Sequence, residues 1–312
     1  MNSPIAILVV LAIFAQSHFG HCGRYGGQNT NSKNQRPLGQ SGESNYDTTS
    51  NPDGDNSDFG KTPKNTSKFC AIKKSEKITL DGVLVGLSAM FSTPIRLLKK
   101  YGPNGGSPNT MEDETAIQQS ENKALVYFSK AAEAGFSILQ RLRPEYEDLI
   151  RSIRNRAFPM FYNGSAGINY ATRLVYRKNP EEVQTEIDAI QPETVASFVN
   201  GIAQYYIAMR EATPGQPVIL TTNEQPEERS LINIMKMFRG VFSAISYMLD
   251  SLVNTGRSGN TRQYLSEVQK IQEKSFSAAK AHVKVLYNEI RRWANVQVGC
   301  EESCDESVES RW

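Results

Sequence analysis

The chain has 312 residues, of which 39% are hydrophobic and 22% are charged, so it carries enough apolar side chains for a folded core. Its 35 lysines and arginines nearly balance its 33 aspartates and glutamates, and a net charge of +2 argues against general binding to nucleic acid. With only three histidines and four cysteines, the chain offers few residues for metal binding or nucleophilic catalysis.

The N-terminal segment is typical of a signal peptide. Residues Ile5–Phe14 form an unbroken apolar run of about ten residues, well short of the ~20 that a membrane-spanning helix needs. Small side chains just before position 18 predict a signal peptide at 1–17 with cleavage before His18, and a cut after Cys22 is the alternative. Because no later stretch approaches the length of a membrane span, we expect a secreted, extracellular protein without integral membrane insertion.

Residues 18–68 are rich in glycine, asparagine and serine and carry few large apolar side chains. Such a segment cannot bury enough apolar surface to offset the ~1–2 kcal/mol per residue that backbone ordering costs, so we predict that it is disordered. Two glycosylation sequons begin at Asn65, in this segment, and at Asn163, in a loop-like stretch further on, and we expect a glycoprotein.

Residues 69–300 show helical rather than strand periodicity, which predicts an all-α fold, a bundle of about seven to eight helices. Clusters of proline and glycine set the limits of these helices, including a break at 159–167. In chain order the predicted helices cover about 76–101, 112–142, two shorter stretches from 144 and from 168, a stretch from 180, and then about 192–212, 227–253 and 260–298. An acidic tail, 301–312, follows.

Two details of this pattern concern packing. The stretch 227–253 has the widest apolar stripe and is predicted to be the central helix. Gly82 and Gly86 stand four residues apart, a spacing that favours close contact between helices of a folded core. An alternative interpretation of the second feature is an amphipathic segment that binds a surface.

The cysteines are candidates for disulfides, because an exported protein meets an oxidising compartment. They lie at the two ends of the predicted helical domain, and a link from the first end to the second would join its start to its finish. Three connectivities remain open. A metal site at the last two cysteines lacks a nearby histidine, so we expect no metal and no cofactor. The four candidates are Cys22, Cys70, Cys300 and Cys304.

No catalytic motif is present in the sequence. His282 lies near the apolar stripe of the last helix and is interpreted as a histidine at the edge of the core rather than as a proton shuttle. Gly164-Ser165 lacks the preceding glycine of a nucleophile elbow. We therefore predict no catalytic residues and no enzyme, and a hydrolase with carboxylates on two helices is the least favoured alternative.

The segment 141–178 holds eight basic and three acidic residues. Guanidinium groups suit sulfate, phosphate and carboxylate, so this segment is a candidate site for an acidic polymer such as a sulfated glycan, or for an acidic partner. The alternative is an ordinary solvated face, paired with the acidic tail. The candidate residues are Arg143, Arg151, Arg154, Arg156, Arg173 and Arg177.

The sequence thus favours a secreted, non-enzymatic helical protein that acts as an extracellular interaction or structural component. Its partner is expected to be an extracellular protein or an acidic polymer. An alternative function is a carrier of small hydrophobic molecules, with a cavity among the helices lined by aromatic and methionine side chains. Such a carrier needs an enclosed cavity of several hundred Å³, which the structure can test.

Overall fold

The computed structural model describes residues 64–101, 110–175, 180–213, 226–258, 261–296 and 304, all in the unit Thr62–Trp312. These residues form α-helices, one short 3-10 helix and connecting turns, without a strand, which confirms the all-α prediction. The predicted signal peptide, most of the segment 18–68 and the acidic tail apart from Cys304 lie outside the described residues. The elements are α2 (Lys64–Tyr101), α3 (Met111–Leu142), η1 (Pro144–Tyr146), α4 (Glu147–Leu174), α5 (Pro180–Glu211), α6 (Pro226–Ser258) and α7 (Thr261–Trp293).

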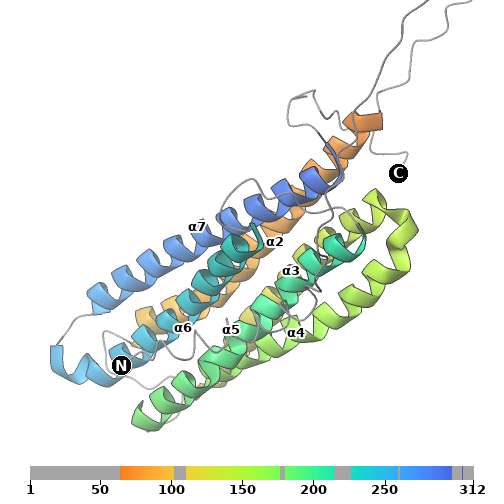
Figure 1. Cartoon of the computed structure of the whole chain (residues 1–312). Helices are drawn as coiled ribbons and strands as arrows, with labels where there is room; N and C mark the ends of the chain where they lie inside the picture. The colour runs from red at the N-terminus through yellow and green to blue at the C-terminus, as the bar shows by residue number, and fades with distance from the viewer. Residues whose placement is uncertain are drawn as a thin grey trace, which may run out of the picture. The chain divides into compact units, whose positions relative to one another are not determined.

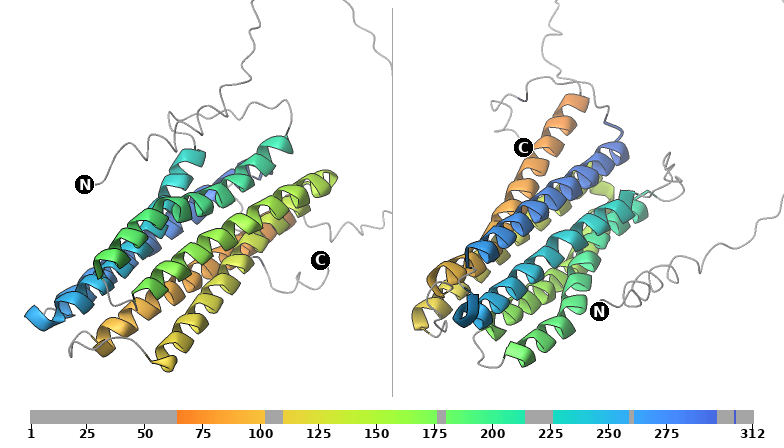
Figure 2. Two further views of the ribbon diagram at one scale, coloured as in Figure 1. Left: turned by 90° about the horizontal axis from the view of Figure 1, so that it is seen from below. Right: turned by 90° about the vertical axis from the view of Figure 1, so that its left-hand side faces the viewer.

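The helices pack side by side as a bundle, and consecutive helices run in opposite directions (Figure 1). Each helix packs against the next one in the chain, and α2 also packs against α7, so the first and last described helices are neighbours. Figure 2 shows the same arrangement from two further sides. Helix α6 packs against α2, α4, α5 and α7, which confirms the prediction that this segment is the central helix.

Aromatic rings fill the middle of the core. Phe198 of α5 stacks on Phe238 of α6 with ring centroids 3.6 Å apart, and Phe128 of α3 lies 5.9 Å from Phe238. All three side chains are buried. A single layer of rings therefore ties α3, α5 and α6 together, as expected for apolar side chains on the inner faces of three amphipathic helices.

The number of helices differs from the prediction: the described residues form six α-helices rather than seven to eight. The two predicted interruptions at Pro159 and Pro192 are wrong, because both prolines lie inside continuous helices, α4 and α5. Both prolines are exposed. Buried side chains one turn or more to either side hold each helix against its neighbours, and this packing outweighs the backbone hydrogen bond that proline removes.

Glycines allow two pairs of helices to approach closely. A Cβ atom on Gly86 of α2 would lie 2.8 Å from the ring of Phe128 in α3, so the predicted close packing at Gly82 and Gly86 is confirmed. A Cβ atom on Gly164 of α4 would lie 2.7 Å from the ring of Phe198 in α5. The glycines interpreted as a loop at 159–167 therefore belong to a helix that packs tightly against another helix.

Helix α2 begins at Lys64 rather than near position 76, so the last residues of the segment predicted to be disordered are helical. Within the described part of the chain, its stretch Lys68–Tyr101 is the one helix long and apolar enough to cross a membrane. More than half of its most apolar window is buried against the other helices. That burial is the pattern of a helix in a protein core.

A disulfide joins the start of the helical segment to its finish. Cys70, in the second turn of α2, is bonded to Cys304, with 5.6 Å between the Cα atoms. Helix α7 ends beside the start of α2 (Figure 1), where Asn295 takes a positive φ of 54° and its backbone N–H donates to the carbonyl of Arg292. One of the predicted links between the start and the finish of the helical domain is thereby confirmed.

Candidate functional site

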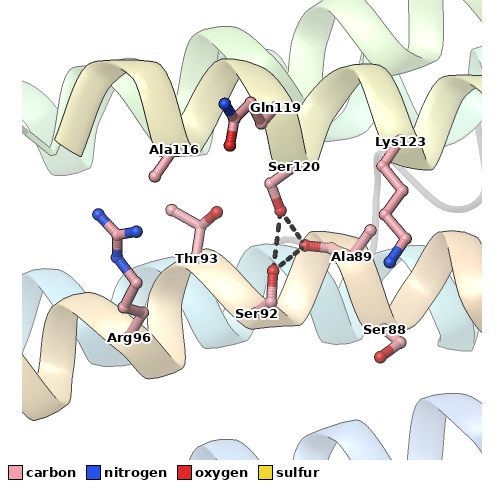
Figure 3. A pocket seen from close by; sticks show the side chains of 9 residues that line it. All are labelled: Ser88, Ala89, Ser92, Thr93, Arg96, Ala116, Gln119, Ser120 and Lys123. Atoms are coloured by element: carbon pink, nitrogen blue, oxygen red, sulfur yellow. Dashed lines mark hydrogen bonds between the residues drawn. The ribbon is translucent and has the colours of Figure 1, made fainter. Parts of the chain in front are cut away.

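A polar groove runs along the outer surface between α2 and α3, with a volume of about 290 Å³ (Figure 3). Positions three or four apart share one face of a helix, and both helices carry short side chains at these positions, which leaves space between the helices. No carboxylate lines the groove. Its lining consists of Ser88, Ala89, Ser92, Thr93 and Arg96 from α2 and Ala116, Gln119, Ser120 and Lys123 from α3.

Two serines in the middle of the groove are held by one carbonyl group. The hydroxyls of Ser92 and Ser120 both donate to the backbone oxygen of Ala89, the first over 2.7 Å. Their oxygens lie 2.9 Å apart, and all three groups converge in Figure 3. A hydroxyl has one proton and two lone pairs, so both serines remain able to accept hydrogen bonds from a ligand.

Cationic side chains stand at the two ends of the groove, Arg96 from α2 and Lys123 from α3 (Figure 3). Lys123 is exposed and has no ionic partner among the described residues. Its side chain extends towards α2 across one end of the groove. Arg96 remains 45% exposed although it also forms an ion pair below the surface.

The ion pair of Arg96 belongs to a buried network around Asp113, whose side chain is fully inaccessible. Arg96 and Lys100 donate to one carboxylate oxygen over 3.1 Å and 3.0 Å, and the hydroxyls of Tyr101 and Thr110 donate to the other. Burial alone would raise the pKa of Asp113, but these hydrogen bonds hold it below its ordinary value, so the carboxylate stays charged. The network fixes the position of Arg96.

Two cationic side chains share the buried carboxylate at this end of the groove. Two cations, Arg96 and Lys100, surround one carboxylate, and the hydrogen bond to Asp113 raises the pKa of Lys100. Because Asp113 already receives four donors, it has no need of a further partner from solvent. The groove is therefore suited to a ligand that carries a negative charge and hydroxyl groups.

The structure places the described arginines of the predicted anion-binding cluster along the length of α4 and just before η1, so the first and the last of them lie far apart. Arg143 precedes η1, pairs with Glu145 at 3.3 Å and lies 5.3 Å from the ring of Trp293. Arg173 lies in the last turn of α4 and pairs with Glu121 of α3 at 3.1 Å. About 30 residues of helix separate them, which corresponds to roughly 40 Å.

Two of the arginines between these, Arg151 and Arg154, also have carboxylate partners. Arg151 pairs with Glu147 and Asp148 of its own helix, the second at 3.3 Å. Arg154 reaches Glu133 of α3 at 2.7 Å. These ion pairs cancel much of the positive charge that the sequence places on α4.

Of the two remaining arginines, Arg156 is exposed on α4 and has no ionic partner in the described part of the chain, whereas Arg177 lies outside the described residues. Cys22 and Cys300 also lie outside them. Of the two sequons, Asn163 is exposed on α4 and Asn65 lies in the first turn of α2. Glycosylation at either asparagine stays a prediction.

His282 is buried in the core, where its Nδ1 atom forms a hydrogen bond with the hydroxyl of Ser230 in α6. Burial lowers the pKa of His282 to about 3, so the imidazole is neutral near pH 7. Ser230 is fully inaccessible, and no substrate reaches this pair in the described structure. The sequence does not reveal Ser230 as the partner because it lies 52 residues away on another helix.

A cavity in the core of the described residues has a volume of about 40 Å³. The aromatic residues Phe128, Phe198 and Phe238 and the imidazole of His282 contribute to its lining. Ligand pockets in proteins usually occupy about 300–1,000 Å³. The cavity is therefore too small for the hydrophobic cargo of a carrier.

Within the described ranges, no group of three or more histidine, cysteine, aspartate or glutamate side chains is placed to hold a metal ion. The groove was missed at the sequence level, although its small polar residues recur at helical spacing in both helices. No known protein family, characterised protein or solved structure matches the chain, so the geometry of these sites carries the functional argument.

Proposed function

We propose that this protein is exported and acts outside the cell as a non-enzymatic interaction protein, a helical bundle that presents the groove between α2 and α3 to a partner. The observation that carries this proposal is the disulfide between Cys70 and Cys304. Disulfides persist in oxidising compartments and are rare in the cytosol. The N-terminal apolar run supports the same location.

The position of the disulfide also supports a rigid scaffold. It spans 234 residues and ties the first described helix to the segment that follows the last one. In the chain-entropy model, closing a loop of this length contributes about 4–5 kcal/mol to the free energy of unfolding. A bundle closed in this way keeps α2, and with it one wall of the groove, in a fixed position.

The groove supports a binding role rather than a chemical one. Its serines are already engaged with a backbone carbonyl, and its lining contains neither a histidine nor a carboxylate that would act as a general acid or base. The carboxylate of Asp113, which is bonded to Arg96, is buried and holds that arginine in place. Binding through fixed charges and hydroxyls is the function that this arrangement favours.

The two alternative functions have weaker support. A carrier of hydrophobic molecules would need the core to open, because its cavity holds only about 40 Å³. An acidic polymer bound along α4 would have to displace the carboxylates paired with Arg151, Arg154 and Arg173. Extraction of the purified protein with organic solvent tests the carrier directly, since a bound lipid or pigment would be recovered.

The location is tested by producing the protein in a secreting eukaryotic cell and analysing the medium. We expect secreted protein that lacks residues 1–17 and has a disulfide between Cys70 and Cys304, identified by mass spectrometry of peptides without reduction. Protein that stays in the cell with Met1 and reduced thiols at both cysteines would overturn the proposal.

The binding role is tested by passing the native extracellular fluid over the immobilised protein. Immobilised wild-type protein should retain material that the Ser88→Trp variant, with its groove filled, does not retain. Lys284→Gln, a change at an exposed residue of α7, is the matched control and should retain the same material as wild type. The material should leave the column with unchanged mass, whereas chemical conversion would show an enzyme.

A further inference from the structure

We propose that the groove between α2 and α3 binds a single acidic sugar unit, one that carries a carboxylate or a sulfate group, either free or as part of a polymer. This inference rests on the proposed function and names the ligand class of the same site. It uses the cations, hydroxyls and dimensions of the groove rather than the arginines of α4.

The requirement for a negative charge follows from the ends of the groove. Arg96 and Lys123 stand at opposite ends and no lining residue carries a carboxylate (Figure 3). Arg96 is 45% exposed, so it can donate to a ligand while it stays bonded to Asp113. A cationic ligand would meet two like charges, and a neutral one would gain nothing from them.

The requirement for hydroxyl groups follows from the middle of the groove. Ser92 and Ser120 donate their protons to Ala89 and keep lone pairs as acceptors. Gln119 adds both a donor and an acceptor beside them. A bare inorganic anion only accepts hydrogen bonds and would leave these acceptors without donors, whereas a sugar supplies hydroxyl donors next to its acidic group.

The size of the groove limits the ligand. A volume of about 290 Å³ lies at the lower end of the range for pockets that hold small molecules, and it suits one sugar ring better than a bulky or extended group. Several residues that line the groove are exposed, so the rest of a polymer could continue beyond it. A single acidic unit thus occupies the site, and neighbouring units remain outside.

The experiment is a titration of the full protein, observed by NMR or calorimetry, with four probes: glucuronic acid, glucose 6-sulfate, glucose and inorganic sulfate. We expect saturable binding of glucuronic acid, glucose 6-sulfate or both, with at least tenfold weaker binding of glucose and of inorganic sulfate. The first two probes distinguish a carboxylate from a sulfate. Equal binding of glucose, or of inorganic sulfate alone, would overturn the inference.

Three variants locate the binding. Lys123→Gln should weaken it about tenfold, because a charge-assisted hydrogen bond is lost. Ser88→Trp keeps both cations but fills the groove, and should abolish binding. Lys284→Gln on α7 has the same change of charge as Lys123→Gln and should bind like wild type, with an unchanged helical circular dichroism spectrum for all three.

The outcomes separate this inference from the proposed function. If Ser88→Trp loses its native extracellular partner but no acidic sugar binds wild type, the ligand class is wrong and the interaction role stands. If acidic sugars bind wild type and Ser88→Trp equally, the groove is not their site and the inference is overturned. If wild type and Ser88→Trp retain the same native material, the role assigned to the groove fails as well.

Discussion

The α2–α3 pair and the α4–α5 pair bring their helices together in the same way, with a glycine of the first helix against a phenylalanine ring of the second. Gly86 meets Phe128 in one pair, and Gly164 meets Phe198 in the other. The two rings lie 6.3 Å apart in the shared core. The inner surfaces of the two pairs are therefore alike.

Their outer surfaces differ in the use of charge. On α4, Arg151, Arg154 and Arg173 pair with carboxylates of the same helix or of α3, whereas Arg156 has no ionic partner in the described part of the chain, so much of the basic charge is locally cancelled. Between α2 and α3 there are fewer cations, but Lys123 has no ionic partner in the described ranges and Arg96 stays partly exposed. The two outer surfaces therefore differ in how their charges are paired as well as in how many charges they carry.

The largest expected effect is a loss of folding stability at low pH, caused by the buried His282 in α7. His282 of α7 has its pKa lowered to about 3 by burial, whereas the unfolded chain binds the same proton near pH 6.5. The folded protein should therefore lose stability as the pH falls below about 6.5, by about 1.4 kcal/mol per unit and about 3 kcal/mol by pH 4. Urea unfolding at several pH values measures the loss.

The variant His282→Gln provides the control for this pH effect. Glutamine does not titrate and can still form a hydrogen bond with Ser230, so the fall in stability between pH 6.5 and pH 5 should be smaller than in wild type. Hydrogen exchange should report equal loosening of the α2–α3 and α4–α5 pairs. Faster exchange in only one of the two helix pairs would show that protonation of His282 does not destabilise both pairs equally.

The second prediction tests whether the two pairs use the same packing. Gly86→Leu and Gly164→Leu should each lower the free energy of unfolding by about 1–3 kcal/mol, because the new side chain collides with a phenylalanine ring. Ser88→Leu on α2 and Ala166→Leu on α4 are matched controls at exposed positions and should change stability little. A large loss at one glycine and none at the other would refute the likeness of the inner surfaces.

The third prediction compares a buried ion pair with an exposed one. Asp113→Asn should cost about 1–3 kcal/mol, since Arg96 and Lys100 lose a buried charged partner. Asp148→Asn on α4, where the pair with Arg151 is exposed, should cost about 0.3–0.5 kcal/mol. Thermal or urea unfolding of the two variants at neutral pH decides whether the network at the groove is the stronger one.

The smallest effect is expected on a heparin column. Lys123→Glu and Arg151→Glu change the net charge equally, but Lys123 faces the groove and Arg151 is already paired with carboxylates. The salt concentration that elutes the protein should therefore fall more for Lys123→Glu. A larger fall in the eluting salt concentration for Arg151→Glu would indicate that α4, rather than the groove, is the anion-binding surface.

The fold was largely predictable from the sequence. Helical periodicity, the central position of α6 and the close packing at Gly86 follow from the local spacing of side chains, and the structure confirms them. The number of helices was not predictable, because Pro159 and Pro192 resemble breaks when only their neighbours in the chain are considered. Burial on both sides of each proline reverses that local preference.

The candidate site was much less predictable. The six arginines stood out because they are close in sequence, yet their carboxylate partners on α3, Glu133 and Glu121, lie 21 and 52 residues away from Arg154 and Arg173. The groove combines short side chains from two helices, and neither helix shows it alone. Ion pairs and surface hollows of this kind depend on which helices become neighbours.

By itself, therefore, the sequence determined the helical class of this protein, the inner face of most helices and the presence of cysteines near the start and the finish of the helical segment, because these properties depend on spacing along one chain. Only the tertiary structure decided that Cys70 pairs with Cys304, that Arg154 and Arg173 of α4 pair with carboxylates of α3, and that Arg96 and Lys123 flank a common groove. These properties depend on distances between residues far apart in the chain, which are fixed only when the helices pack.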